Sequence, residues 1–114
     1  MAPEDFHAFC RALPGATFEV LWGADEVYKV GGKMFAATGP GGGVSFKAND
    51  VAFEMLIETG AAKPAPYAAR FKWVQMDDTS VLSDAELKAY LREAHTLVAS
   101  KLPRKQKAAL GLEQ

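Results

Sequence analysis

The sequence predicts a single α+β domain over residues 1–114, in which helices cover one face of an antiparallel sheet of about five strands. The chain has 114 residues, which is the size of one domain and too few for two ordinary hydrophobic cores. Short stretches of strand-forming residues follow one another between residues 17 and 47, and their short turns require antiparallel neighbours. Three segments with helical spacing of apolar residues supply helices for one sheet face.

The first expected element is a short amphipathic helix near the N-terminus. Its apolar residues follow the i, i+3, i+4, i+7 spacing, at Phe6, Phe9, Cys10 and Leu13. Pro3 suits the first turn of this helix, and Pro14-Gly15 ends it.

Four strands are expected next, over Thr17–Leu21, Glu26–Val30, Lys33–Ala37 and Val44–Lys47. Residues 23–25 turn the chain, Gly31-Gly32 fits a two-residue hairpin turn, and residues 39–43 form a glycine-rich loop. Because strand side chains alternate, Val44 and Phe46 should lie on one sheet face, and Ser45 and Lys47 on the other.

The second half of the chain is expected to be mainly helical. Asn49 or Asp50 caps a helix that Gly60 ends. Residues 61–69, with two prolines, read as a loop, and residues 71–76 as the fifth strand. Ser83 and Glu86 have capping-box spacing and begin the longest helix, which Pro103 ends or kinks before a last helical turn or two. The apolar stripe of that helix is Leu87, Tyr90, Leu91, Ala94, Leu97 and Val98.

Composition limits the classes of function. The lone Cys10 excludes an internal disulfide, so a reducing cytoplasm is the default compartment. No uncharged run is apolar enough to span a membrane, and the acidic N-terminus lacks the apolar stretch of a secretory signal. The net charge of −1 argues against tight, non-specific DNA binding, which normally uses a basic excess.

Cationic residues on the expected strands are the main candidate binding site. If they align on one sheet face, they form a basic surface beside aromatic side chains, as single-stranded nucleic-acid sites do. An ordinary solvated sheet face is the favoured alternative, because acids such as Asp25, Glu26, Asp50 and Glu54 are interspersed. The candidate nucleic-acid-binding residues are Lys29, Lys33, Lys47, Arg70, Lys72 and Trp73.

Two glycine-rich or basic segments add weaker signals. The loop of residues 39–43 lacks the lysine and hydroxyl of a P-loop and leads into a strand, so it reads as a flexible hairpin tip. As a wing it could still approach a nucleic-acid backbone. The basic residues Lys101, Arg104, Lys105 and Lys107 either grip phosphates or complement the end of the long helix, and the sequence leaves both open.

No catalytic group is expected. His7 and Cys10 are one helical turn apart, but Cys10 lies on the apolar stripe and reads as a buried structural thiol. One Cys and two His are too few for a zinc site of ordinary composition, and His95 reads as a residue at the core boundary. We therefore expect no enzyme activity, no metal and no cofactor.

Several stretches, in order along the chain, resemble the MmcQ/YjbR-like family of small bacterial proteins. They include Lys29-Val30-Gly31-Gly32-Lys33-Met34-Phe35-Ala36, Ser45-Phe46-Lys47-Ala48 and Lys72-Trp73-Val74, with Leu21-Trp22-Gly23, Ala65-Pro66-Tyr67 and residues 97–103 in addition. The resemblance implies a compact α+β fold related to a double-wing DNA-binding architecture. One departure is that His95-Thr96 stands where the family often has Ser-Tyr.

Two hypotheses of function follow. The first is a DNA- or other nucleic-acid-binding module that uses the cationic sheet face and the glycine-rich wing without catalysis. The second is a small-molecule or protein-binding accessory domain, with a pocket lined by Trp22, Tyr28, Tyr67 or Trp73. A monomer that does not associate with membranes is the default expectation.

Overall fold

The computed structural model describes residues 1–21, 24–66 and 68–112 of the chain. Its helices are α1 (Pro3–Ala12), α2 (Asp50–Glu58), α3 (Asp84–Ser100) and α4 (Arg104–Ala109), with a 3-10 turn η1 (Ala69–Phe71). Its strands are β1 (Ala16–Leu21), β2 (Asp25–Val30), β3 (Lys33–Thr38), β4 (Val44–Lys47), β5 (Lys63–Pro64) and β6 (Trp73–Met76). The expected turn at residues 23–25 lies partly outside the described residues.

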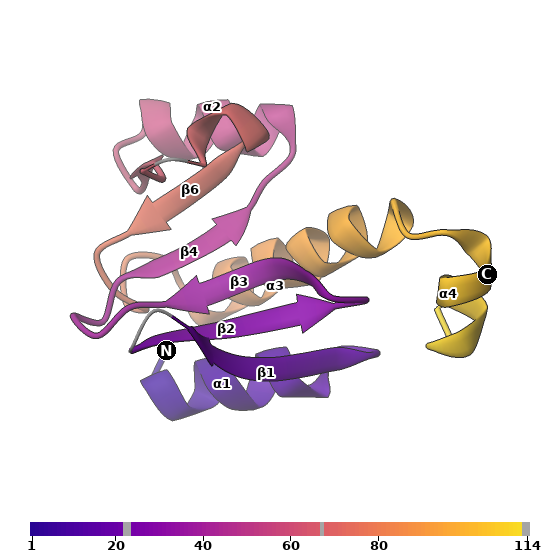
Figure 1. The fold of residues 1–114 in the computed structure, drawn as a ribbon. Helices are drawn as coiled ribbons and strands as arrows, with labels where there is room; N and C mark the ends of the chain where they lie inside the picture. The colour runs from indigo at the N-terminus through magenta and orange to yellow at the C-terminus, as the bar shows by residue number, and fades with distance from the viewer. Residues whose placement is uncertain (22–23, 67, 113–114) are drawn as a thin grey trace.

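The strands form one antiparallel sheet in the order β1-β2-β3-β4-β6-β5, and the predicted α+β class is confirmed (Figure 1). The sheet has six strands where about five were expected, because β5 lies in the segment predicted as a loop. Lys63 and Pro64 pair with Gln75 and Val74 at the edge of the sheet. An edge strand tolerates proline, since the missing N–H would face away from the sheet.

Helices α1, α2 and α3 pack their buried residues into one core against one sheet face. Phe6 from α1, Leu56 from α2 and Leu91 from α3 join Phe46 and Val74 of the sheet in that core. Alternation in β4 and β6 explains the arrangement, since every second side chain of these strands is buried. On the opposite sheet face, here called the open face, the alternate residues Ser45, Lys47, Trp73 and Gln75 are partly exposed.

The hairpin between β2 and β3 contains a tight turn and an irregularity. Gly31 and Gly32 both have positive φ angles, of 60° and 80°, as a two-residue hairpin turn with matching twist requires. The register shifts so that Tyr28 pairs with Ala36 but Lys29 pairs with Met34. Phe35 is therefore an extra residue, and both Phe35 and Ala36 are fully buried.

Side-chain caps set the starts of α2 and α3 as the sequence predicted. The Asn49 side chain accepts a hydrogen bond from the backbone of Ala52 at 2.7 Å. Ser83 and Glu86 form a reciprocal capping box at the start of α3.

Two local expectations were wrong. The last full strand begins at Trp73 and not at residue 71, because residues 69–71 form a 3-10 turn and Lys72 has a left-handed φ of 65°. His95 is buried and not a boundary residue: its Nε2 lies 2.6 Å from the carbonyl oxygen of Pro14, and its ring packs edge-on against Phe35.

In the ranges that the structure describes, no helix is both long and apolar enough to cross a membrane.

Candidate ligand-binding face of the sheet

The open sheet face holds a hollow of about 1090 Å³. Its floor comes from the alternate residues of the strands that do not enter the core. Trp73 lies opposite Lys47 across β6 and β4, and Met34 lies opposite Lys29 across β3 and β2. Phe71 and Pro66 add apolar rim surface. The face therefore combines an aromatic and apolar floor with four lysines and one carboxylate, Asp25.

A gap in the sheet brings a helix residue to this face. Strands β3 and β4 pair only between residues 36–38 and 44–46, so the sheet is open beside Met34. The C-terminal part of α3 reaches this end of the sheet (Figure 1). Val98 of α3 and Lys101, the residue directly after this helix, line the hollow. The sequence pointed to Lys101 only as part of the basic C-terminal segment; its place beside the strand lysines depends on the splay of β3 from β4.

Lys47 lies near Lys101 within the cationic group. Its ammonium donates a hydrogen bond to the carbonyl oxygen of Phe71 at 2.8 Å. Partial burial lowers the pKa of Lys47 and the nearby Lys101 ammonium lowers it further, while the Asp50 carboxylate acts in the opposite direction. An anion placed between Lys47 and Lys101 would relieve the repulsion between the two ammonium groups.

Lys29 and Lys33 differ in their environment. The Lys29 ammonium lies 2.7 Å from a carboxylate oxygen of Glu19 on the neighbouring strand β1. Lys33 is exposed at the end of the hairpin, and none of the salt bridges between described residues involves it. Lys33 is thus better placed than Lys29 to meet an external anion.

Arg70 and Lys72 do not line the hollow. The Arg70 guanidinium lies 4.7 Å from the ring centre of Phe71, and the Lys72 ammonium lies 4.9 Å from that of Phe53 in α2. Both cations contact aromatic rings, an interaction worth about 0.5–1 kcal/mol at exposed sites. Of the six predicted residues, the structure brings together Lys29, Lys33, Lys47 and Trp73.

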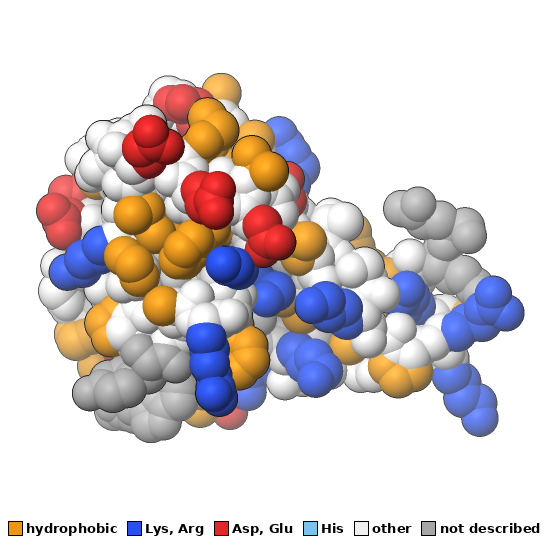
Figure 2. Space-filling view, turned by 90° about the horizontal axis from the view of Figure 1, so that it is seen from above, with side chains coloured by type: hydrophobic (Ala, Val, Ile, Leu, Met, Phe, Trp, Pro, Cys, Tyr) orange, Lys and Arg blue, Asp and Glu red, His pale blue; other side chains and the backbone are white. Residues whose placement is uncertain are grey.

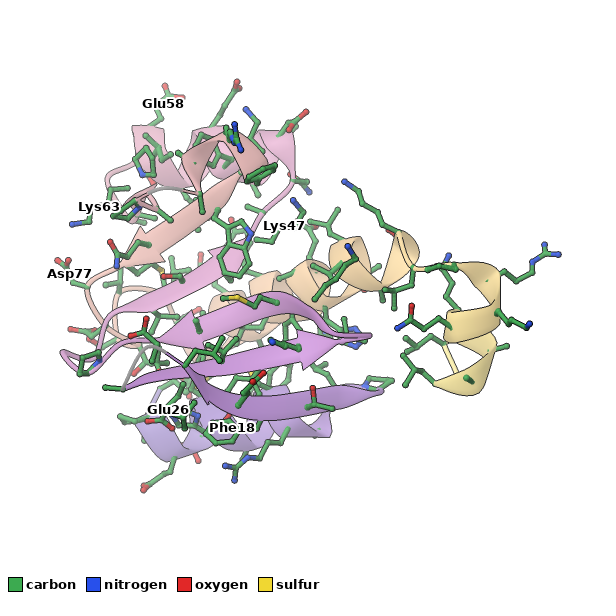
Figure 3. All side chains as sticks on the ribbon, in the orientation of Figure 1. Phe18, Glu26, Lys47, Glu58, Lys63 and Asp77 are labelled. Atoms are coloured by element: carbon green, nitrogen blue, oxygen red, sulfur yellow. The ribbon has the colours of Figure 1, made fainter. Side chains whose placement is uncertain are left out.

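The glycine-rich loop lies at the other end of the sheet. Its ends are joined by a hydrogen bond from the Gly39 amide to the Gly43 carbonyl oxygen at 2.9 Å. Asp25 and Asp77 lie beside this loop with Lys63, and Figure 3 shows Asp77 and Lys63 at the end of the sheet away from the Gly31-Gly32 turn. The wing is thus separated from Lys33 and Lys101 by the length of the strands.

Acidic and basic side chains also lie on different parts of the surface. Figure 2, seen from the α2 end, shows acidic side chains over α2 and Lys and Arg side chains in a band that runs toward α4. The net charge of −1 therefore hides a local concentration of cations.

Tyr28 does not line the open face. It is fully buried in the core, and its hydroxyl lies 2.5 Å from Nδ1 of His7, whose Nε2 is 3.6 Å from Glu26. Burial raises the pKa of Tyr28 to about 12, which keeps the phenol protonated at neutral pH. Of the four aromatic residues named as alternatives for a pocket lining, Tyr28 is in the core and Trp73 lines the hollow. Trp22 and Tyr67 lie outside the described residues.

Cys10 is buried as predicted, and desolvation raises the pKa of its thiol to about 12. A thiol with this pKa is a poor nucleophile at neutral pH. Within the described part of the chain, no three His, Cys, Asp or Glu side chains are grouped as metal ligands.

Comparison with known proteins adds the family. The chain matches no curated protein. It is similar in fold to the Deinococcus radiodurans protein DR2400, which contains the DUF419 domain, with a TM-score of 0.85 and 22% sequence identity. That match covers 96% of this chain and 87% of DR2400. The YjbR family model matches residues 11–97, which include the hairpin and the open sheet face. The predicted resemblance is confirmed, and the chain belongs to the YjbR family.

Proposed function

We propose that the chain is a binding module for single-stranded nucleic acid, and that the strand lies along the open sheet face. The observation that carries the proposal is a hollow whose lining includes Lys33, Lys47 and Lys101 together with Trp73, which lies opposite Lys47. Proteins that bind single strands combine cations for the backbone with aromatic platforms for the bases.

Each part of the hollow has a role in this proposal. Trp73 and Phe71 offer ring faces for unpaired bases, and Phe71 is 53% exposed. Lys33, Lys47 and Lys101 contact phosphates. Lys29 contributes less, because Glu19 already compensates its charge.

A single strand fits this face better than a duplex. Bases in a duplex are stacked on one another and cannot reach a ring recessed in a sheet, whereas an unpaired base can turn toward it. Three phosphate contacts on a single strand predict a slope of about −2 for the logarithm of the binding constant against the logarithm of salt concentration. Binding should therefore be modest at physiological salt.

The test is fluorescence anisotropy of labelled single-stranded DNA, single-stranded RNA and duplex DNA across a salt series. Lys33→Gln/Lys101→Gln should weaken single-strand binding by about tenfold, because each exposed, solvent-screened phosphate contact contributes up to about 1 kcal/mol. Lys63→Gln/Lys105→Gln is the matched control. Both lysines are exposed and lie outside the hollow, and their substitution removes the same total charge.

Stacking has a separate test. Trp73→Ala should weaken single-strand binding by about tenfold, while Trp73→Phe should retain most of it, since base–aromatic stacking contributes about 1–3 kcal/mol per base. Absence of saturable binding at low salt would refute the proposal. Tighter binding of a mononucleotide than of any oligonucleotide would instead favour the small-molecule alternative.

A further inference from the structure

A second hollow lies on the helix side of the molecule, between α3, α4 and the loop that joins α1 to β1. Its volume is about 660 Å³. Arg92 and Thr96 of α3 form one wall, Arg104 and Lys107 of α4 form another, and Pro14 of the loop closes a third side. It shares no described lining residue with the hollow on the sheet face.

The charged residues at this hollow are all cations. Arg92, Arg104 and Lys107 line it, and its described lining contains no Asp or Glu. None of the salt bridges between described residues involves these three side chains. Three cations around one hollow are notable in a chain whose net charge is −1.

Helix-end electrostatics account for only one cation of this cluster: Lys107 lies in the last turn of α4, whereas Arg104 begins that helix and Arg92 lies inside α3. Cations near the end of α3 would complement its negative pole. However, the last turn of α3 carries no basic residue, and Arg92 lies about two turns before the end. Arg92 is instead held near the ring of Phe9, with 5.4 Å between its guanidinium carbon and the ring centre.

The rest of the hollow is firm and partly apolar. The His95 ring nitrogen, 2.6 Å from the carbonyl oxygen of Pro14, ties the loop to α3. Leu13, Ala99 and Leu112 supply apolar surface between the cations. Small-molecule sites typically join such apolar surface to a few polar groups, in volumes of about 300–1,000 Å³.

We propose that this hollow binds a phosphorylated small molecule. The two guanidinium groups and the Lys107 ammonium bind the phosphate oxygens, because planar guanidinium forks match phosphate oxygens in pairs. The apolar wall of Leu13 and Leu112 takes the uncharged part of the ligand. This site is separate from the nucleic-acid surface proposed above and does not depend on it.

The test is a titration of the full chain with inorganic phosphate and inorganic pyrophosphate, followed by ¹H–¹⁵N NMR at low salt. Amide shifts should saturate at residues 96–100 and 104–107, with pyrophosphate binding more tightly. Arg104→Gln/Lys107→Gln should weaken pyrophosphate binding by about tenfold or more. The control Lys63→Gln/Lys105→Gln has the same charge change and keeps α4 helical, so it should alter the affinity less than about twofold.

Three outcomes would overturn the proposal. One is the absence of saturating shifts with pyrophosphate. Another is an equal loss of affinity in the control variant, which would indicate general attraction by the basic end of the molecule. The third is displacement of pyrophosphate by a single-stranded oligonucleotide, which would assign the hollow to the nucleic-acid surface. Independent binding of pyrophosphate and oligonucleotide supports two separate sites.

Discussion

Gly31→Ala is expected to destabilise the protein far more than Gly32→Ala, although the two glycines are neighbours in one turn. A Cβ at Gly31 would lie 2.6 and 2.7 Å from the two terminal methyl carbons of Leu102, whereas a Cβ at Gly32 would meet nothing within 4 Å. Both positions have positive φ, so both substitutions share the backbone cost.

The structure gives the magnitudes. A left-handed conformation costs a non-glycine residue about 1–2 kcal/mol. Overpacking against a buried side chain costs about 1–3 kcal/mol more, and Leu102 is only 4% exposed. Gly32→Ala should therefore lower the free energy of unfolding by about 1–2 kcal/mol, and Gly31→Ala by about 2–5 kcal/mol.

The assay is urea unfolding of both variants, with Leu102→Ala added to each. Leu102→Ala removes the methyl carbons that collide. It should therefore lower the free energy of unfolding by less in the Gly31→Ala background than in the wild type. That coupling should be about 1 kcal/mol or more, and close to zero for Gly32→Ala. Equal destabilisation by the two glycine substitutions would refute the reasoning that Gly31 is needed for packing.

Three further predictions concern single groups. Burial raises the pKa of Cys10 from 9.0 to about 12, so the contribution of the protonated thiol to stability is complete below pH 9 and is lost as the pH rises toward 12. Between pH 9 and 11, the free energy of unfolding from urea titrations should therefore fall less for Cys10→Ala than for the wild type. Equal falls in the two proteins would contradict this. Lys101→Gln should raise the pKa of Lys47 measured by NMR, because it removes a neighbouring positive charge; an unchanged pKa would show that the two ammonium groups do not interact. Ser83→Ala should lower the free energy of unfolding by about 1 kcal/mol through loss of the α3 cap, with exposed Ser100→Ala as a control expected to change it by less than about half as much.

Local signals were sufficient for most of the fold. Asn49, Ser83 and Glu86 act through neighbours within one helical turn, so their roles could be read from spacing alone. The Gly31-Gly32 turn and the alternation of β4 are similarly local. These elements formed as predicted because the bonds that define them join residues close in sequence.

Two of the errors, at β5 and at His95, concern contacts between residues distant in sequence. β5 exists only because β6 lies beside it, and a two-residue strand with proline carries no periodicity of its own. His95 is buried because the Pro14 carbonyl, 81 residues away, lies next to its ring. No spacing rule links such pairs.

The candidate site likewise has residues whose positions could be predicted from local sequence and residues whose positions could not. Alternation correctly separated Lys47 from the core, since its neighbour Phe46 is buried. The left-handed backbone at Lys72 changes the direction of the chain before β6, and this side chain ends over Phe53. Arg92 gave no signal of its own, because its partners in the second hollow come from a different helix.

The sheet has one buried and one exposed face, and this has a consequence for how the sequence of such a protein can diverge in evolution. In β4 and β6, even-numbered and odd-numbered positions have different environments. In β4, Val44 and Phe46 pack against the helices, while Ser45 and Lys47 lie on the open face. A substitution at Lys47 can therefore alter the exposed surface without disturbing the packing of Phe46 one residue earlier. Retention of the fold in DR2400 at 22% identity shows how far such sequences can diverge while the architecture persists. A shared fold alone is thus a poor guide to whether two such proteins bind the same partner.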